Sequence, residues 1–122
     1  MGVGENYFTT FVFMQKIKIK PLSVNTAFKG RRFRTKEYDQ YQKELLWLLK
    51  PLTIPEGKLC LTITYGLSSP LSDLDNPNKQ FIDTLSKKYG FNDNRIYRLN
   101  TEKVDVNKGC EFIEFEITEY NY

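Results

Sequence analysis

Two segments of this chain alternate between apolar and polar residues, and this alternation constrains the fold more than any other feature. Near the C-terminus the apolar positions are Ile113, Phe115 and Ile117, separated by Glu114 and Glu116. In the middle of the chain the positions with the same spacing are Leu59, Leu61, Ile63 and Tyr65. Successive side chains of a β-strand point to opposite faces, so each segment predicts a strand with one buried face. A sheet of such strands needs a second layer, and we expect helices to supply it in an α+β fold.

Two helices are predicted between the strands. Thr35 is a suitable N-cap for a helix that Pro51 ends. The apolar stripe of this helix consists of Tyr38, Tyr41, Leu45, Leu48 and Leu49. Pro77 fits the first position of a second helix, with Asp75 or Asn76 as its cap. Gly90 fits the end of that helix.

A first strand over residues 11–20 precedes the helices, and residues 95–106 and 110–120 are predicted to form a terminal hairpin. Ile17 and Ile19 point inward in the first strand, between outward-facing lysines. Asn107-Lys108-Gly109 is a strong turn signal between the last two strands. The expected order is β-α-β-α-β-β, with a small mixed sheet packed against two helices in a single domain.

Length and composition indicate one folded domain in the cytoplasm. The chain has 122 residues, and its hydrophobic content of 40% and aromatic content of 15% argue against disorder. No apolar run approaches the roughly 18 residues that a membrane span needs, so no membrane partner is expected. Cys60 and Cys110 lie in strand-like stretches, where we expect reduced thiols that fill the core. Met14 is a candidate start, which makes residues 1–13 a candidate N-terminal extension of a domain spanning 14–122.

Positive charge is concentrated in the first third of the chain. Residues 6–36 contain eight Lys and Arg and no acid, whereas the chain after residue 36 contains ten bases and fourteen acids. We expect a polyanion-binding face here. Its candidate residues are Asn25, Lys29, Arg31, Arg32, Arg34 and Lys36, with Phe28 and Phe33 available for stacking. The alternative is solubilising charge on an exposed loop, with the two aromatic residues pinning that loop to the core.

Acidic residues and a lysine gather around the start of the second predicted helix. Asp73 and Asp75 are one residue apart, Lys79 lies four positions after Asp75, and Asp83 four after Lys79. Asp93 is a further acid 18 residues beyond Asp75. Carboxylate oxygens are the ligands that Mg²⁺ requires, and the absence of histidine excludes imidazole chemistry. The alternative is structural, with the acidic pair as capping and turn residues and Lys79–Asp83 as a surface ion pair.

Several short motifs in the second half of the chain form one pattern. They are Asp73-Leu74-Asp75-Asn76-x-x-Lys79, Phe81-Ile82-Asp83-x-Leu85, Gly90-Phe91 and Asp93-Asn94-Arg95-Ile96. Pro21-Leu22-Ser23-Val24-Asn25 upstream and Lys108-Gly109 downstream extend it over nearly the whole chain from Met14 onward. The pattern resembles the RusA family of Holliday junction resolvases, which are common in phages and prophages. The chain departs from that family at Asn92, where an amide stands in place of one of two adjacent acids.

The resemblance implies a homodimeric, Mg²⁺-dependent endodeoxyribonuclease that resolves four-way DNA junctions by symmetric nicking, with Mn²⁺ as a substitute metal. It implies Asp73, Asp75 and Asp93 as metal ligands and catalytic residues, Lys79 as the catalytic lysine, and Asp83 as an additional acid. It also implies a role in DNA recombination and repair, in a bacterial cell or a phage-infected host. Two other functions stay open: a metal-dependent nuclease of other branched or flap DNA, and a junction-binding module without cleavage.

Overall fold

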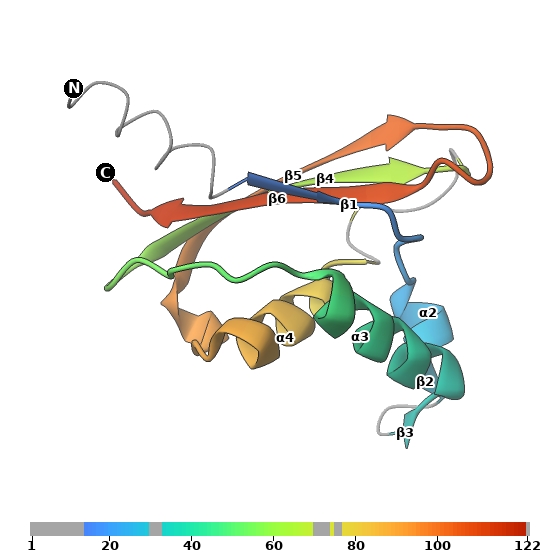
Figure 1. The fold of residues 1–122 in the computed structure, drawn as a ribbon, viewed down its shortest axis with the longest axis horizontal. Coiled ribbons are helices and arrows are strands. Elements are labelled where there is room, and N and C mark those ends of the chain that lie inside the picture. Colours follow the sequence, from blue (N-terminus) through green and yellow to red (C-terminus); the bar gives the residue numbers. More distant parts are fainter. Residues whose placement is uncertain (1–13, 30–32, 70–73, 75–76, 122) are drawn as a thin grey trace.

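A four-stranded mixed sheet with the strand order β1-β6-β4-β5 forms one layer of the structure (Figure 1). Its strands are β1 (Met14–Ile17), β4 (Leu59–Leu67), β5 (Ile96–Asp105) and β6 (Phe112–Glu119). Strand β6 pairs antiparallel with both β1 and β4, whereas β4 pairs parallel with β5. The two strands with strict alternation, β4 and β6, are therefore the two central strands.

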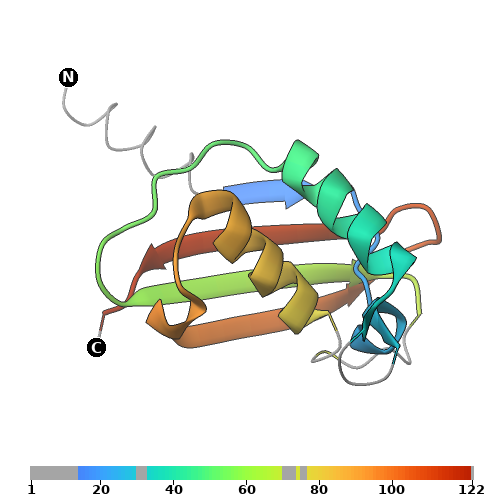
Figure 2. The same cartoon turned by 90° about the horizontal axis from the view of Figure 1, so that it is seen from below.

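The computed structural model describes residues 14–29, 33–69, 74 and 77–121. These residues form the expected α+β arrangement, in which two long helices cover one face of the sheet (Figures 1 and 2). The helices are α3 (Lys36–Leu48) and α4 (Asn78–Tyr89). The predicted N-terminal extension, residues 1–13, lies outside the described residues, and so does the first part of the predicted strand over residues 11–20.

Helices α3 and α4 run parallel to one another, and a ladder of polar contacts joins them. The Tyr38 hydroxyl donates to Asp83 Oδ2 at 3.3 Å, and Gln42 Nε2 donates to Thr84 Oγ1 at 3.3 Å. One turn further along, Lys88 Nζ donates to the Leu46 carbonyl at 3.2 Å. Because the contacts advance in the same direction on both helices, both helix N-termini point to the same end of the molecule.

The core lies between the helices and the inner face of the sheet. The alternating residues of β4 and β6 are at most 1% exposed, as the sequence predicts. From the helices the core receives Tyr38, Tyr41, Leu45, Leu49, Phe81 and Leu85. Leu48 is 38% exposed, so its assignment to the apolar stripe of α3 is wrong. Thr35 caps α3 as expected, with its side chain accepting a hydrogen bond from the Tyr38 N–H at 3.2 Å.

The predicted terminal hairpin is wrong, because β4 lies between β5 and β6. Helix α4 connects β4 to a parallel neighbour, and such crossovers place the second strand beside the first. Residues 106–111 then carry the chain past β4 to its other side, a distance of two strand spacings or roughly 10 Å. Strand β6 thus fills a central position, where its inner residues are buried and both of its edges are paired.

Two smaller expectations, about the start of α4 and the end of β1, also need correction. Pro77 is the N-cap of α4 and not its first residue, and it makes no side-chain capping hydrogen bond. The caps predicted from sequence, Asp75 and Asn76, lie outside the described residues. Gly90 ends the helix as expected, with a φ of 69° that favours glycine. Strand β1 ends at Ile17, before Pro21, although Ile17 and Ile19 are both buried as predicted.

The segment that holds the candidate polyanion-binding residues contains secondary structure. A short helix, α2 (Val24–Ala27), is followed by the two-stranded antiparallel pair β2 (Phe28–Lys29) and β3 (Phe33–Arg34). In this pair Phe28 lies opposite Arg34, and Lys29 lies opposite Phe33. We refer to β2, β3 and the residues that join them as the basic ribbon.

The cysteine prediction holds only in part. Both cysteines are free thiols, but Cys110 is exposed and Cys60 is half-buried, so neither fills the core as expected. Among the described helices none is both long and apolar enough to cross a membrane.

Candidate functional site

Two contacts hold the first turn of α4 in place. The Tyr65 hydroxyl, from the buried middle of the sheet, donates to Asn78 Oδ1 at 2.7 Å. Gln80 Nε2 donates to the Leu22 carbonyl of the segment that leads into α2. Burial raises the pKa of Tyr65, so this phenol stays a neutral donor throughout the physiological pH range. The helix start that follows the predicted Asp73–Asp75 motif is therefore rigidly anchored.

Lys79 lies in this anchored turn and contacts Asp83 on the same helical face. Its Nζ is 3.9 Å from Asp83 Oδ2, and the side chains of Lys79 and Asp83 are 60% and 40% exposed. The same oxygen of Asp83 accepts from Tyr38, whose pKa is raised to about 12 by burial first and by the charge of Asp83 second. Lys79 is thus a solvent-accessible cation whose neighbouring carboxylate is held from α3.

The basic ribbon and the start of α4 lie at the same end of the molecule. Figure 2 shows α2, β2 and β3 beside the first turn of α4, and the hydrogen bond from Gln80 to Leu22 joins the two regions. The ribbon and Lys79 are more than 40 residues apart in the sequence. The two features that the sequence singles out for nucleic-acid chemistry are therefore neighbours in the fold.

The predicted DNA-contacting residues are not all placed alike. Arg31 and Arg32 lie outside the described residues, while Asn25 is on α2 and Lys29 is on β2. Lys36 is exposed at the start of α3. Arg34 already contacts Asp39 and Gln42 of α3.

Arg34 fastens the ribbon to α3. Its guanidinium is 3.0 Å from Asp39 Oδ1, donates to Gln42 Oε1 at 3.0 Å and stacks 4.1 Å from the Tyr38 ring centroid. Its side chain is 42% exposed, which leaves part of the guanidinium open to a phosphate. Arg34 therefore orients β3 against α3.

Asp93 lies at the opposite end of α4 from Lys79. It begins the short 3-10 helix η1 (Asp93–Arg95), which follows the C-terminal end of α4. A helix of 12 residues spans about 16 Å, so this length separates the two ends. Arg95 fixes η1 there by donating to the Gly57 carbonyl at 2.9 Å. Within one chain the structure does not bring Asp93 beside Lys79, contrary to the predicted cluster.

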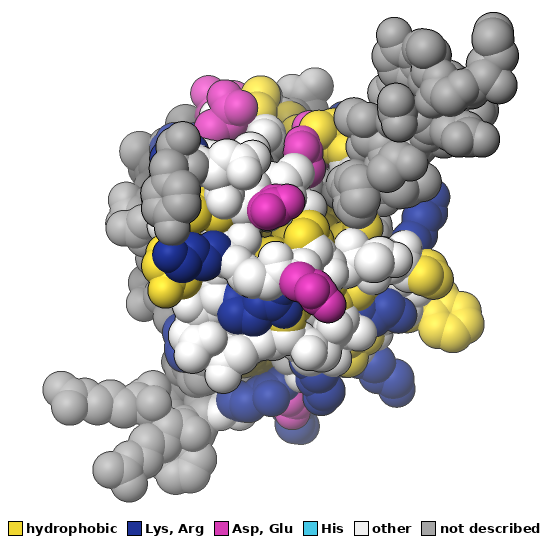
Figure 3. Space-filling view, turned by 90° about the vertical axis from the view of Figure 1, so that its left-hand side faces the viewer, with side chains coloured by type: hydrophobic (Ala, Val, Ile, Leu, Met, Phe, Trp, Pro, Cys, Tyr) yellow, Lys and Arg dark blue, Asp and Glu magenta, His cyan; other side chains and the backbone are white. Residues whose placement is uncertain are grey.

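The surface around the C-terminal end of α4 carries charges of both signs. Figure 3 shows acidic side chains over its middle and upper part, and Lys and Arg side chains along its lower part, over the helical layer. The basic residues in the last turn of α4 are Lys87 and Lys88. Lys87 Nζ lies 3.4 Å from Gln42 Oε1, so this lysine also joins the two helices. This end does not present a concentrated acidic surface.

Mg²⁺ is the cofactor that the sequence implies, and the described residues alone do not make a site for it. Across residues 14–29, 33–69, 74 and 77–121 no three His, Cys, Asp or Glu side chains converge to hold a metal ion. Asp83 is the carboxylate beside Lys79, and its Oδ2 already accepts from Tyr38. The predicted ligands Asp73 and Asp75 lie outside the described residues. Leu74 between them packs partly buried against the core.

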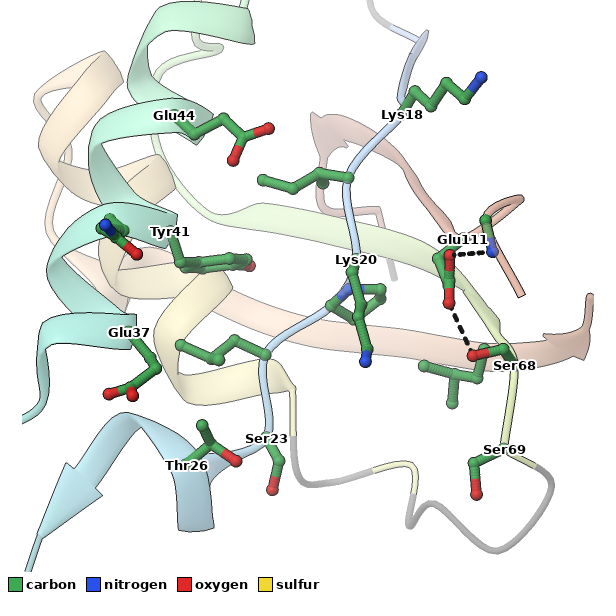
Figure 4. Close-up of a pocket in the computed structure, with 16 residues that line it drawn as sticks. Lys18, Lys20, Ser23, Thr26, Glu37, Tyr41, Glu44, Ser68, Ser69 and Glu111 are labelled. Atoms are coloured by element: carbon green, nitrogen blue, oxygen red, sulfur yellow. Dashed lines mark hydrogen bonds between the residues drawn. The ribbon is translucent and has the colours of Figure 1, made fainter. Parts of the chain in front are cut away.

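A groove of about 690 Å³ lies beside the ribbon, between α3 and the segment that follows β1 (Figure 4). Lys18 and Lys20 line it on one side, and Glu37 and Glu44 of α3 line it on the other. Tyr41 extends from α3 toward the groove, and burial raises its pKa. The opposing charges give the groove little net attraction for a polyanion, so it does not extend the basic surface.

Ser68 and Glu111 form a clamp at one wall of this groove. The Ser68 hydroxyl donates to Glu111 Oε2 at 2.7 Å, and the Gly109 N–H donates to Glu111 Oε1 at 2.9 Å (Figure 4). These hydrogen bonds, that of Ser68 foremost, hold the pKa of Glu111 below its ordinary value of 4.5. A charged carboxylate that accepts from two donors is a poor base toward Ser68. The pair therefore ties the end of β4 to the turn before β6 and is not a catalytic dyad.

Sequence reasoning missed the ribbon and the contact of Asp83 with Tyr38. The ribbon has a local signal, because a glycine and two arginines at 30–32 separate two aromatic-basic pairs, Phe28-Lys29 and Phe33-Arg34. The contact between Tyr38 and Asp83 joins residues 45 apart and has no local signal.

Comparison of the chain with models of known protein families gave no match, and comparison with curated proteins gave none either. The resemblance of the motifs to junction resolvases therefore stays a prediction.

Proposed function

We propose that this chain is a metal-dependent endonuclease that nicks branched DNA, with the four-way Holliday junction as its substrate. The observation that carries the proposal is the juxtaposition of the basic ribbon and the first turn of α4. The ribbon supplies the positive charge that binds phosphates without reading sequence. The turn beside it carries Lys79 directly after the Asp73–Asp75 pair in the sequence.

Lys79 is the residue that we expect to act on the scissile phosphate. Its ammonium group is exposed and sits on an anchored helix start, so it can meet a phosphate oxygen without reorganising the fold. A cation positioned in this way stabilises the charge that develops on the phosphate in the transition state. Asp83 would hold the lysine in place until the phosphate arrives.

Asp73 and Asp75 are the residues that we expect to hold Mg²⁺, or Mn²⁺ in its place. The bound cation would lower the pKa of a water molecule and neutralise charge on the phosphate. This assignment rests on the sequence motif and its hard oxygen ligands.

Asp93 can share a site with Lys79 only if it comes from another copy of the chain. It lies about 16 Å of helix away from Lys79 within one copy. Symmetric nicking of a four-way junction also requires two sites related by a two-fold axis, which a homodimer supplies. We therefore assign Asp93 either to the site of a partner subunit or to the turn before β5 alone. Mixing Lys79→Ala and Asp93→Asn chains separates these assignments. If Asp93 comes from the partner, both substitutions fall in the same site of the mixed dimer and the other site is intact, so nicking recovers.

The proposed activity is tested by a nicking assay on four-way, three-way, flap and linear duplex DNA. We expect cleavage of the four-way junction with Mg²⁺ or Mn²⁺, and none with EDTA or with Ca²⁺, whose looser coordination positions water poorly. Asp75→Asn should abolish nicking while junction binding is kept. Glu44→Gln is the matched control, because it removes an exposed carboxylate on α3.

Each alternative function has its own outcome in this assay. Equal cleavage of flap and four-way substrates would identify a nuclease of branched DNA in general. Tight junction binding without cleavage under any metal would identify a binding module. Undiminished cleavage in EDTA would refute the metal-dependent mechanism, and normal cleavage by Asp75→Asn would reduce the acidic pair to a structural role.

A further inference from the structure

Strand β5 is a long edge strand whose outer side is open. It has ten residues and pairs only with β4 among the described strands. Eight of its residues are exposed and the other two are half-buried. The exposed residues include two large apolar side chains, Tyr97 at 58% and Leu99 at 42%. An open edge of this length presents unpaired N–H and C=O groups and is a template for another strand. Natural proteins cover such edges or use them for association.

We propose that β5 pairs antiparallel with β5 of a second copy, with Asn100 opposite Asn100, to form a continuous eight-stranded sheet. A two-fold axis perpendicular to the sheet would pass between the two Asn100 residues. This operation places both helical layers on the same face. The proposal deepens the proposed homodimer, from which it takes only the identity of the partner.

The backbone restricts the registers that are available to such a pair. In an antiparallel ladder a residue whose N–H and C=O point toward the neighbouring strand must face another residue of this kind. Along a strand these residues alternate with residues whose groups point the other way, so the sequence numbers of two facing residues must add up to an even number. The same rule keeps residues of one face opposite residues of that face. Self-pairing can therefore be centred on a single residue and never between two.

The charges on the open face of the sheet select one register. Arg98, Asn100 and Glu102 lie opposite Cys60, Thr62 and Thr64 of β4, on the face that the helices leave open. With Asn100 at the centre, Arg98 of each copy faces Glu102 of the other. On the helical side Leu99 then faces Thr101. Opposite charges directly across an antiparallel pair stabilise it, and the two-fold axis makes the contact twice.

The neighbouring registers lack this complementarity. Centring on Leu99 places Arg98 opposite Asn100, and centring on Thr101 places Arg98 opposite Val104. Centring on Glu102 places two carboxylates face to face, which is destabilising. In one copy the Arg98 guanidinium stacks 5.1 Å from the Tyr120 ring centroid. When the Arg98 side chain turns toward Glu102 of the second copy, it exchanges this exposed contact for an ion pair between the two strands.

Charge reversal tests the register directly. Arg98→Glu and Glu102→Arg should each weaken dimerisation roughly tenfold to a hundredfold, because two attractive pairs become repulsive together. The double variant restores opposite charges and should dimerise like the wild type. A mixture of the two single variants should form a heterodimer, since every facing pair in it is again opposite. Lys43→Glu on α3 and Glu56→Arg in a turn are matched charge changes away from β5 and should leave dimerisation unchanged.

Sedimentation velocity over a concentration series measures these equilibria without DNA or metal. Wild-type behaviour of both single variants would overturn the proposal, and so would a double variant that stays dissociated. Recovery in the mixture shows that the single variants are folded. A wild-type chain that dimerises through β5 but does not nick junctions would refute the proposed nuclease and support the proposed interface. A chain that nicks junctions without pairing through β5 would refute the interface and support the nuclease.

A disulfide cross-link measures the register independently. In a Cys60→Ser, Cys110→Ser background, Asn100→Cys should form a dimer on addition of oxidised glutathione, because opposed residues have Cβ atoms about 5 Å apart. Lys103→Cys is the control, since the two positions 103 would lie roughly 20 Å apart along the ladder. Cross-linking at 103 and not at 100 would overturn the proposed register.

Discussion

Gly66→Ala should destabilise the fold, because the Phe112 ring covers this glycine. Gly66 lies in β4 directly opposite Phe112 of β6. A Cβ atom at position 66 would stand 3.0 Å from Cγ of Phe112 and closer still to two other carbons of the ring. Lys16 of β1 places its Nζ 4.3 Å from the centroid of the same ring. The ring therefore contacts both strands that flank β6 and cannot move without disturbing one of them.

The expected cost is about 1–2 kcal/mol of unfolding free energy. Carbon atoms in contact lie about 3.5–4.0 Å apart, so the ring must shift by at least roughly half an ångström. Overpacking of this kind costs about 1–3 kcal/mol. Replacing glycine by alanine also restricts the unfolded chain, which returns about 0.4–1 kcal/mol. The difference between the two effects gives the expected value.

Urea denaturation of a double-mutant cycle measures this cost. In a Phe112→Ala background the obstructing ring is gone, so Gly66→Ala should become neutral or slightly stabilising. The two substitutions should therefore couple by about 1–2 kcal/mol. An equal cost of Gly66→Ala in both backgrounds would refute the explanation, because the strain would then not come from Phe112.

Three further predictions concern the candidate site and the turn before β6. Lys79→Ala should lower single-turnover nicking by ~10²-fold at nearly normal junction affinity; lost affinity with an unchanged rate would make it a DNA-binding residue. Replacing Arg31, Arg32 and Arg34 of the basic ribbon together should weaken binding to every DNA and flatten the slope of log affinity against log salt by roughly one unit per lost contact. An unchanged slope would leave these arginines only a solubilising role. Because its folded pKa is lowered, Glu111 contributes stability above its ordinary value of 4.5 and loses it as the pH falls through the lowered pKa. Thermal unfolding of Glu111→Gln should therefore show a smaller loss between about pH 7 and pH 3 than the wild type, and an equal loss would contradict the assignment.

The elements of the fold follow from local patterns, but the neighbours of each strand do not. Period-two alternation identifies β4 and β6, and the Thr35 cap and Gly90 mark where two helices begin or end. The turn at 107–109 suggested a hairpin because a tight turn usually joins adjacent strands. What decides the pairing is the crossover through α4, which makes β5 a parallel neighbour of β4. The pairing is therefore determined by long-range packing, and the sequence near the turn carries no signal for it.

The candidate site shows the same division. The structural alternative for the motif around Lys79 expects a surface ion pair with Asp83, and the structure shows that pair. The family resemblance groups Asp93 with these residues, but the predicted helix that Gly90 ends already places Asp93 beyond the far end of that helix from Lys79. The structure shows Lys79 and Asp93 at opposite ends of α4. Sequence also gave no sign that Tyr38, from the other helix, contacts Asp83.

The position of β6 at the centre of the sheet has a consequence for how the chain is made. Of the described strands, β1 is synthesised first, yet its register pairs Met14 with Glu116 and Ile17 with Ile113, about 100 residues later. Its partner β6 is the last of these strands to leave the ribosome, so β1 must wait with one apolar face uncovered. Contacts of such long sequence separation slow folding, because the loop that they close is paid for in entropy before they form. A nascent chain that stops before residue 112 would hold β4, α4 and β5 together and leave β1 without a strand to join.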